Sequence, residues 1–139
     1  MVKLVTGGKG KGKTKVMIDL ANERIKTAKG SAVYIDHSNH HMFELDKKLR
    51  LINVKEFNIE TKDEIIGFMK GIISQDRDLE LMFIDGLLKL PSVEFEDVND
   101  FVTRMGNMCA EHNIELTISV SADVSDLNED LQKLVVKSL

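Results

Sequence analysis

Residues 7–14 read GGKGKGKT and match the pattern G-x-x-x-x-G-K-[ST] at every fixed position. A loop of this kind wraps a phosphate anion with backbone N–H groups, and glycine keeps side chains from blocking that approach. Four of the nine glycines in the chain lie in this segment. A match by chance in so short a chain is roughly a one-in-a-hundred event or rarer. The segment therefore predicts a phosphate-binding loop.

The positions of this loop have separate expected roles. Gly7 and Gly12 allow unusual backbone angles, and the N–H groups that follow converge on phosphate at the positive end of the next helix. Lys13 is expected to reach the terminal phosphates, and the hydroxyl of Thr14 to ligate Mg²⁺. The predicted cofactor-binding residues are Gly7, Gly8, Lys9, Gly10, Lys11, Gly12, Lys13 and Thr14.

Two acidic residues follow apolar runs and are candidates for the other half of the site. Leu81 to Ile84 lead directly to Asp85, and residues 32–35 lead to Asp36. Ligands of an open parallel sheet lie beyond the carboxyl ends of its strands, so Asp85 and the loop are expected at one edge. We expect Asp85 to hold magnesium through water, which makes Thr14 and Asp85 the predicted metal site. The alternative for Asp85 is a cap of the following turn.

Asp36 has two open interpretations. It can support the metal site without touching the ion, or orient an attacking water. The other interpretation is a turn residue that ends a strand. The neighbouring His37, His40 and His41 add imidazoles that suit a transition metal, but H-x-x-H-H fixes no ligand geometry. A position near the nucleotide and a solvated loop are the other interpretations of these histidines.

The elements that must position these residues alternate along the chain. Apolar runs predict five strands, at residues 3–6, 32–36, 51–57, 79–85 and 114–121. Helical spacing predicts helices over about 13–28, from Thr61, from Ser92 and from about Asp126, and a short helix within 40–50. Such alternation is typical of a parallel sheet covered by helices on both faces. We predict an α/β three-layer sandwich with a mostly parallel five-stranded sheet, in one domain over residues 1–139.

With the loop, Asp85 and the strand alternation together, the chain resembles the P-loop nucleoside triphosphatases over nearly its whole length. Within them it is similar to a minimal RecA-like ATPase domain, because VYID ends the second strand and residues 117–121 form a polar final strand. The resemblance implies the P-loop NTPase fold, with residues 114–121 between the loop strand and the Asp85 strand and with Ser119 or Ser121 near the terminal phosphate. It implies ATP and Mg²⁺ as cofactors, and catalytic roles for Lys13, Asp85 and Asp36.

The sequence departs from that family in its hydrolytic residues. Hydrolysis there generally needs a glutamate, yet Gly86 follows Asp85 and a His-Ser-Asn segment follows Asp36; the spacing of Glu44 does not select it as a substitute. No arginine finger is evident, since the only arginines are Arg24, Arg50, Arg77 and Arg104, on predicted helices or at element ends. We therefore expect a nucleoside triphosphate-binding protein that is a weak or partner-activated ATPase or a nucleotide switch. A small-molecule kinase and a non-catalytic interaction protein are the alternatives.

Composition narrows the class of protein further. The chain has 42% hydrophobic and 30% charged residues, a net charge of −4 and no run of 18 apolar residues, so no membrane span is expected. The first residues resemble no secretion signal, which favours a cytoplasmic location. Nucleic acid is disfavoured as a partner because no basic stripe with interleaved aromatics occurs. A protein partner or a second copy of the chain is expected instead.

Overall fold

Six strands form one sheet in a computed structural model that describes residues 1–139. They are β1 (Val2–Thr6), β2 (Ser31–Asp36), β3 (Leu49–Asn53), β4 (Leu79–Ile84), β5 (Glu115–Val120) and β6 (Val135–Ser138). Their order across the sheet is β3-β2-β4-β5-β1-β6, and every neighbouring pair is parallel. The predicted α/β class with a parallel sheet is confirmed, whereas the predicted number of five strands is wrong.

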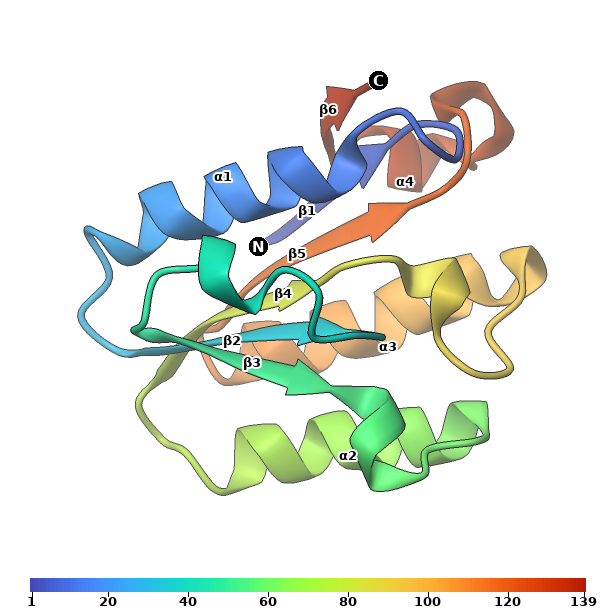
Figure 1. Ribbon diagram of the computed structural model, residues 1–139. Coiled ribbons are helices and arrows are strands. Elements are labelled where there is room, and N and C mark those ends of the chain that lie inside the picture. Colours follow the sequence, from blue (N-terminus) through green and yellow to red (C-terminus); the bar gives the residue numbers. More distant parts are fainter.

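Helices cover both faces of this sheet. They are α1 (Lys13–Ile25), α2 (Lys62–Ser74), α3 (Val98–Glu111) and the short α4 (Glu129–Gln132). Helix α1 lies on one face, and α2 and α3 lie on the other (Figure 1). Two separate apolar cores follow from this layering, one of 26 buried residues beneath α2 and α3 and one of 11 beneath α1.

The strand that the sequence missed is β6, at one edge of the sheet. A helix from about Asp126 was expected there, but α4 is a single turn that starts after Asn128, whose side chain accepts a hydrogen bond from the Leu131 N–H at 2.9 Å. The β-branched Val135 and Val136 follow, and residues 135–138 pair with β1. Leu127 and Leu131 have helical spacing because both reach the larger core, although only one of them is in a helix.

Local backbone conformation moves several other boundaries. Ser92 has a φ of 62°, so α3 cannot start there and begins at Val98 instead. Residues 54–57 form a 3₁₀ turn, which ends β3 at Asn53, and only residues 42–44 of the expected helix within 40–50 form a helical turn. The predicted start of α2 is confirmed, because the Thr61 hydroxyl accepts a hydrogen bond from the Glu64 N–H at 3.1 Å.

The order of the strands brings the candidate site residues to one edge. Strand β5 lies between β4 and β1, which is the position that the family resemblance implied for residues 114–121. Side chains alternate between faces along a strand, and Tyr34 and Phe83 belong to the core beneath α1. Asp36 and Asp85 each follow two residues later, so both lie on the α1 face at the carboxyl ends of their strands.

An ion-pair network fixes the opposite, amino-terminal ends of these strands to α1. Arg24 on α1 contacts Glu80 and Glu115, each at 3.1 Å, and Lys3 contacts Glu115 at 3.3 Å. The N–H groups of Lys29 and Gly30 also donate to Glu80, and these hydrogen bonds, followed by the Arg24 contact, lower the pKa of this carboxyl. Arg24 therefore has a structural role, at the end of the sheet opposite the loop.

Replacement by alanine is expected to have opposite effects on stability at two glycines of this fold. A Cβ at Gly30 would lie 2.1 Å from the Asp78 carbonyl oxygen, whereas a Cβ at Gly67 on α2 would meet no atom within 4 Å. Gly30→Ala is expected to lower the free energy of unfolding by about 2 kcal/mol or more, because backbone must move to relieve the overlap. Gly67→Ala is expected to raise it by up to ~1 kcal/mol, the difference in helix propensity. Urea denaturation of both variants checks the pair, and a neutral Gly30→Ala would contradict the packing.

Candidate phosphate-binding site

The backbone of residues 7–12 forms the loop that joins β1 to α1. Gly10 and Gly12 have φ values of 75° and 89°, in the left-handed region that favours glycine. Gly12 is the residue that caps the start of α1, and the Lys11 N–H donates to the Gly8 carbonyl at 3.3 Å inside the loop. The loop therefore lies at the amino-terminal end of α1 (Figure 1), where the first N–H groups of a helix have no partners within the helix.

Lys13 is the buried cation of this loop. The residue is only 8% exposed, and its Nζ donates to the Gly8 carbonyl oxygen at 2.9 Å. Burial lowers its pKa, the charge of Lys89 lowers it further, and Asp85 raises it. An ammonium group with little water and a second cation nearby has a strong electrostatic preference for an incoming anion.

The loop shares a small polar cavity of about 230 Å³ with the ends of two strands. No apolar side chain lines it; its residues are Lys9, Gly10, Gly12, Lys13, Thr14, Asp85, Gly86, Lys89, Ser119 and Ser121. Of the predicted site residues, Gly7, Gly8, Lys11 and Asp36 do not line the cavity. Lys89 does line it, although no sequence pattern pointed to this residue, which ends a short 3₁₀ turn (Leu87–Lys89) after β4.

Asp85 is held at the centre of a buried hydrogen-bond network. Its residue is 4% exposed; the Tyr34 hydroxyl donates to Oδ2 at 2.8 Å, and the Ser119 hydroxyl donates to Oδ1 at 2.8 Å. The N–H of Gly86 donates to the Ser119 oxygen at 2.7 Å. Tyr34 was not singled out from the sequence, although its position two residues before Asp36 places it on the site face. These bonds fix the orientation of the carboxylate.

Asp36 is 2% exposed and is not part of the cavity lining. The His37 N–H donates to Asp36 Oδ1 at 2.7 Å; the Nδ1 atom of His37 lies 2.9 Å from the same oxygen but is out of line for a hydrogen bond. Burial raises the pKa of Asp36, and the nearby charge of Asp85 raises it as well, whereas the hydrogen bond from the His37 N–H and the charges of His37 and His41 oppose this shift. Because Asp36 is buried and does not line the cavity, it fits an acid that acts through neighbouring groups better than one that touches a ligand.

The other polar residues near Asp36 form no ligand set. His41 pairs with Glu44, and the His40 N–H donates to the Ser38 hydroxyl at 3.4 Å. No group of three or more histidine, cysteine, aspartate or glutamate side chains is arranged to hold a metal ion. Glu44 therefore pairs locally rather than entering the cavity.

Thr14 and Asp85 can still serve a magnesium ion in the manner the sequence suggested. Both residues line the same cavity; Thr14 carries a hydroxyl and Asp85 a carboxylate, and hard oxygen donors of this kind suit Mg²⁺. Each Asp85 oxygen already accepts one hydrogen bond and keeps a further lone pair, which fits an ion held through water. Two protein donors are few, so phosphate oxygens and water would have to complete the coordination.

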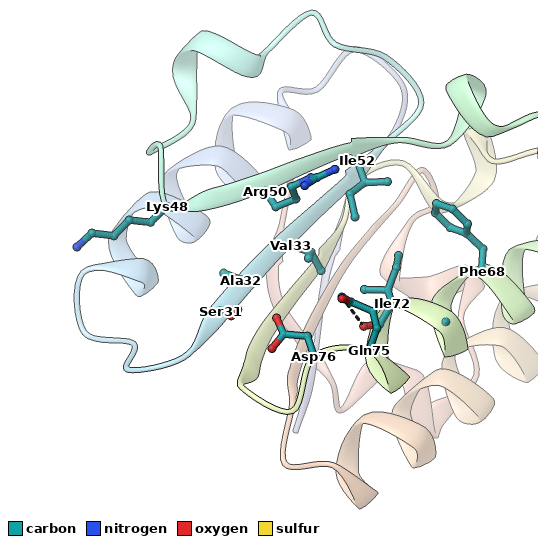
Figure 2. A pocket seen from close by; sticks show the side chains of 11 residues that line it. Ser31, Ala32, Val33, Lys48, Arg50, Ile52, Phe68, Ile72, Gln75 and Asp76 are labelled. Atoms are coloured by element: carbon teal, nitrogen blue, oxygen red, sulfur yellow. Dashed lines mark hydrogen bonds between the residues drawn. The ribbon is translucent and has the colours of Figure 1, made fainter.

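A second, larger cavity of about 750 Å³ lies on the other face, between α2 and the edge formed by β2 and β3. In Figure 2, Lys48 points away from the other lining side chains. The Gln75 amide donates to the Ile72 carbonyl at 3.3 Å, and Asp76 accepts a hydrogen bond from the Asp78 N–H at 2.9 Å. Two of its polar groups thus bond to nearby backbone, whereas the cavity at the loop is lined by polar residues and glycines alone. The polar cavity at the loop is the better candidate site.

No protein-family model matches this chain, and no curated protein matches it significantly. None of the helices is both long and apolar enough to cross a bilayer.

The raised pKa of Asp36 predicts how this residue affects stability. The folded state binds the Asp36 proton more tightly than the unfolded chain does, so ionised Asp36 destabilises the fold at pH 7. Asp36→Asn keeps an oxygen that accepts from the His37 N–H and removes the charge. We expect it to raise the free energy of unfolding at pH 7.

This difference between variant and wild type should shrink as the pH falls through the folded pKa, and vanish below the ordinary value of 3.8, where both states are protonated. Urea denaturation at several pH values, from 7 down to below 3.8, measures it. A variant that is less stable than the wild type at pH 7 would show that the charge of Asp36 is compensated in the fold.

Proposed function

We propose that this chain is a P-loop nucleoside triphosphate-binding protein, similar to a minimal RecA-like ATPase domain, that takes ATP together with Mg²⁺. The observation that carries the proposal is the buried Lys13, whose ammonium lies in the loop of residues 7–14 and borders a wholly polar cavity. Anion sites at the start of a helix combine backbone N–H groups with the helix dipole, and this loop adds a lysine to both.

Each residue of the cavity has a distinct task in this proposal. The N–H groups at the start of α1 bind phosphate oxygens, and Lys13 exchanges its bond to Gly8 for one to the terminal phosphates. Thr14 and Asp85 would hold the magnesium ion, which offsets phosphate charge. Tyr34 and Ser119 keep the Asp85 carboxylate turned toward the cavity.

Turnover is expected to be slow without a partner. Neither a glutamate nor an arginine lines the phosphate cavity, so no residue there matches the usual water-activating or charge-stabilising groups. The two segments that follow the acidic strands carry exposed aromatic side chains, with Phe43 93% and Phe95 44% exposed. Large exposed apolar groups on such segments suit a protein contact that changes with nucleotide state. A partner-activated ATPase or a nucleotide switch is therefore the form we favour.

One observation favours a small-molecule kinase as the second candidate. A cavity of about 380 Å³ shares Lys9, Lys89 and Ser121 with the phosphate cavity, and its other walls include Leu88, Val93 and Phe95. An acceptor molecule seated there would adjoin the terminal phosphate. ATP-dependent phosphorylation of a small metabolite in a screen would favour this candidate over the switch.

Lys13 gives the direct test of nucleotide binding. Lys13→Ala removes the buried ammonium and is expected to weaken binding of ATP with Mg²⁺ by about a hundredfold or more, as expected for lost charge-assisted bonds. Isothermal titration calorimetry measures the affinity. The matched control is Lys15→Ala, because Lys15 is exposed and pairs with Asp19 on the outer side of α1.

The control is expected to bind ATP as the wild type does. If the wild-type protein binds neither ATP nor GTP in the presence of magnesium, the proposal is wrong. Equal weakening by both substitutions would indicate a non-specific effect of positive charge rather than a phosphate-binding loop.

A further inference from the structure

The turn after β4 is shaped to carry Lys89 back toward the loop. Gly86 has a φ of 79°, and the Lys89 N–H donates to the Gly86 carbonyl at 2.9 Å. A Cβ at Gly86 would lie 3.2 Å from Lys89 Cδ, so the stem of the lysine lies directly over the glycine. Residues 86–89 thus form a tight turn whose last side chain folds over its first residue.

Lys89 belongs to the lining of the phosphate cavity, and its side chain has no partner of its own. Lys89 lines that cavity with Lys9 and Lys13, against a single carboxylate from Asp85. No hydrogen bond or ion pair of the Lys89 side chain occurs in the structure, and its charge is near enough to lower the pKa of Lys13. Three lysines around a cavity with one carboxylate leave an excess of positive charge that only an anion can balance.

The arginines of the chain cannot supply this charge, because none of them lines the cavity. Arg24 pairs with Glu80 and Glu115, and Arg104 lies 3.7 Å from Asp100. Arg50 borders the cavity between α2 and β3, on the opposite face of the sheet. Lys89 therefore supplies a positive charge at a cavity that no arginine lines.

The turn that bears Lys89 is also connected to the predicted magnesium residue. The Gly86 N–H donates to the Ser119 hydroxyl, which donates to Asp85. All three groups are buried, so the start of the turn has a fixed position relative to the Asp85 carboxylate. This connection sets the place from which the Lys89 side chain extends.

We propose that Lys89 binds the terminal phosphate of a bound nucleoside triphosphate, so that this residue makes the site distinguish a triphosphate from a diphosphate. The inference rests on the proposed nucleotide-binding function. It assigns the discrimination to a lysine of the same chain, outside the loop of residues 7–14. A nucleoside diphosphate, which lacks that phosphate, gains nothing from Lys89.

Calorimetric titration with a non-hydrolysable ATP analogue and with ADP, both with Mg²⁺, tests this inference. Lys89→Gln is expected to weaken binding of the ATP analogue by about tenfold while changing ADP binding less than about twofold, as for one charge-assisted contact. Lys89→Arg is expected to keep most of the discrimination, since it keeps the charge. The control Lys70→Gln removes the same charge from an exposed position on α2 and should change neither affinity.

The possible failures are distinguishable. If the wild type binds both nucleotides and Lys89→Gln leaves the ratio of the two affinities unchanged, the assignment of Lys89 is wrong and nucleotide binding stands. Equal weakening of both nucleotides would also overturn it, because it would place Lys89 at a phosphate that ADP shares. If the wild type binds neither nucleotide, the proposed function and this inference both fail.

Discussion

The carboxylate of Asp85 is the group on which the arrangement of the site depends. It is buried, and a buried carboxylate without hydrogen-bond partners costs several kcal/mol. Its two donors, Tyr34 and Ser119, are 51 and 34 residues away along the chain, on β2 and β5. Both bonds can form only when β2, β4 and β5 pair in the observed register. The central sheet and the candidate site are therefore stabilised by the same contacts.

One face of the sheet carries most of the apolar core, and the other carries the polar residues of the candidate site. The core beneath α2 and α3 contains 26 buried residues, whereas the core beneath α1 contains only 11. Positions on the α1 face, within the strands or directly after them, would extend the smaller core but are occupied by buried polar residues: Asp36, Asp85, Thr117 and Ser119. Burial of apolar surface on the far face offsets what these polar groups cost on the near one.

Features encoded by neighbouring residues could be predicted from the sequence. The glycine pattern of the loop, the apolar runs that end at Asp36 and Asp85, and the Thr61 cap all depend on a few adjacent positions, and the structure has a tight glycine turn, strand ends and a helix start there. Features that depend on distant contacts could not be predicted. The leucines before β6 have helical spacing although the chain becomes a strand.

The same limit applied to the site. The role of Tyr34 depends on the hydrogen bond from its hydroxyl to Asp85, which joins the neighbouring strand β2 to the end of β4. The role of Lys89 depends on a turn whose first residue, Gly86, is held by a hydrogen bond to Ser119. Lys89 belongs to no recognisable motif. Tyr34 lies within VYID, the segment that carried the family resemblance, but that resemblance gave its hydroxyl no role. Alternation along β2 was the further signal for Tyr34, since it places every second residue on one face.

The bond from Lys13 to the Gly8 carbonyl has a consequence for how a ligand would enter. The loop already satisfies its own lysine, so an arriving phosphate competes with an internal acceptor instead of meeting an unoccupied donor. Such competition lowers the enthalpy gained on binding, but it also restricts the lysine side chain beforehand and so reduces the entropy lost. The strength of this one internal bond would then set the balance between the two, and with it the temperature dependence of affinity.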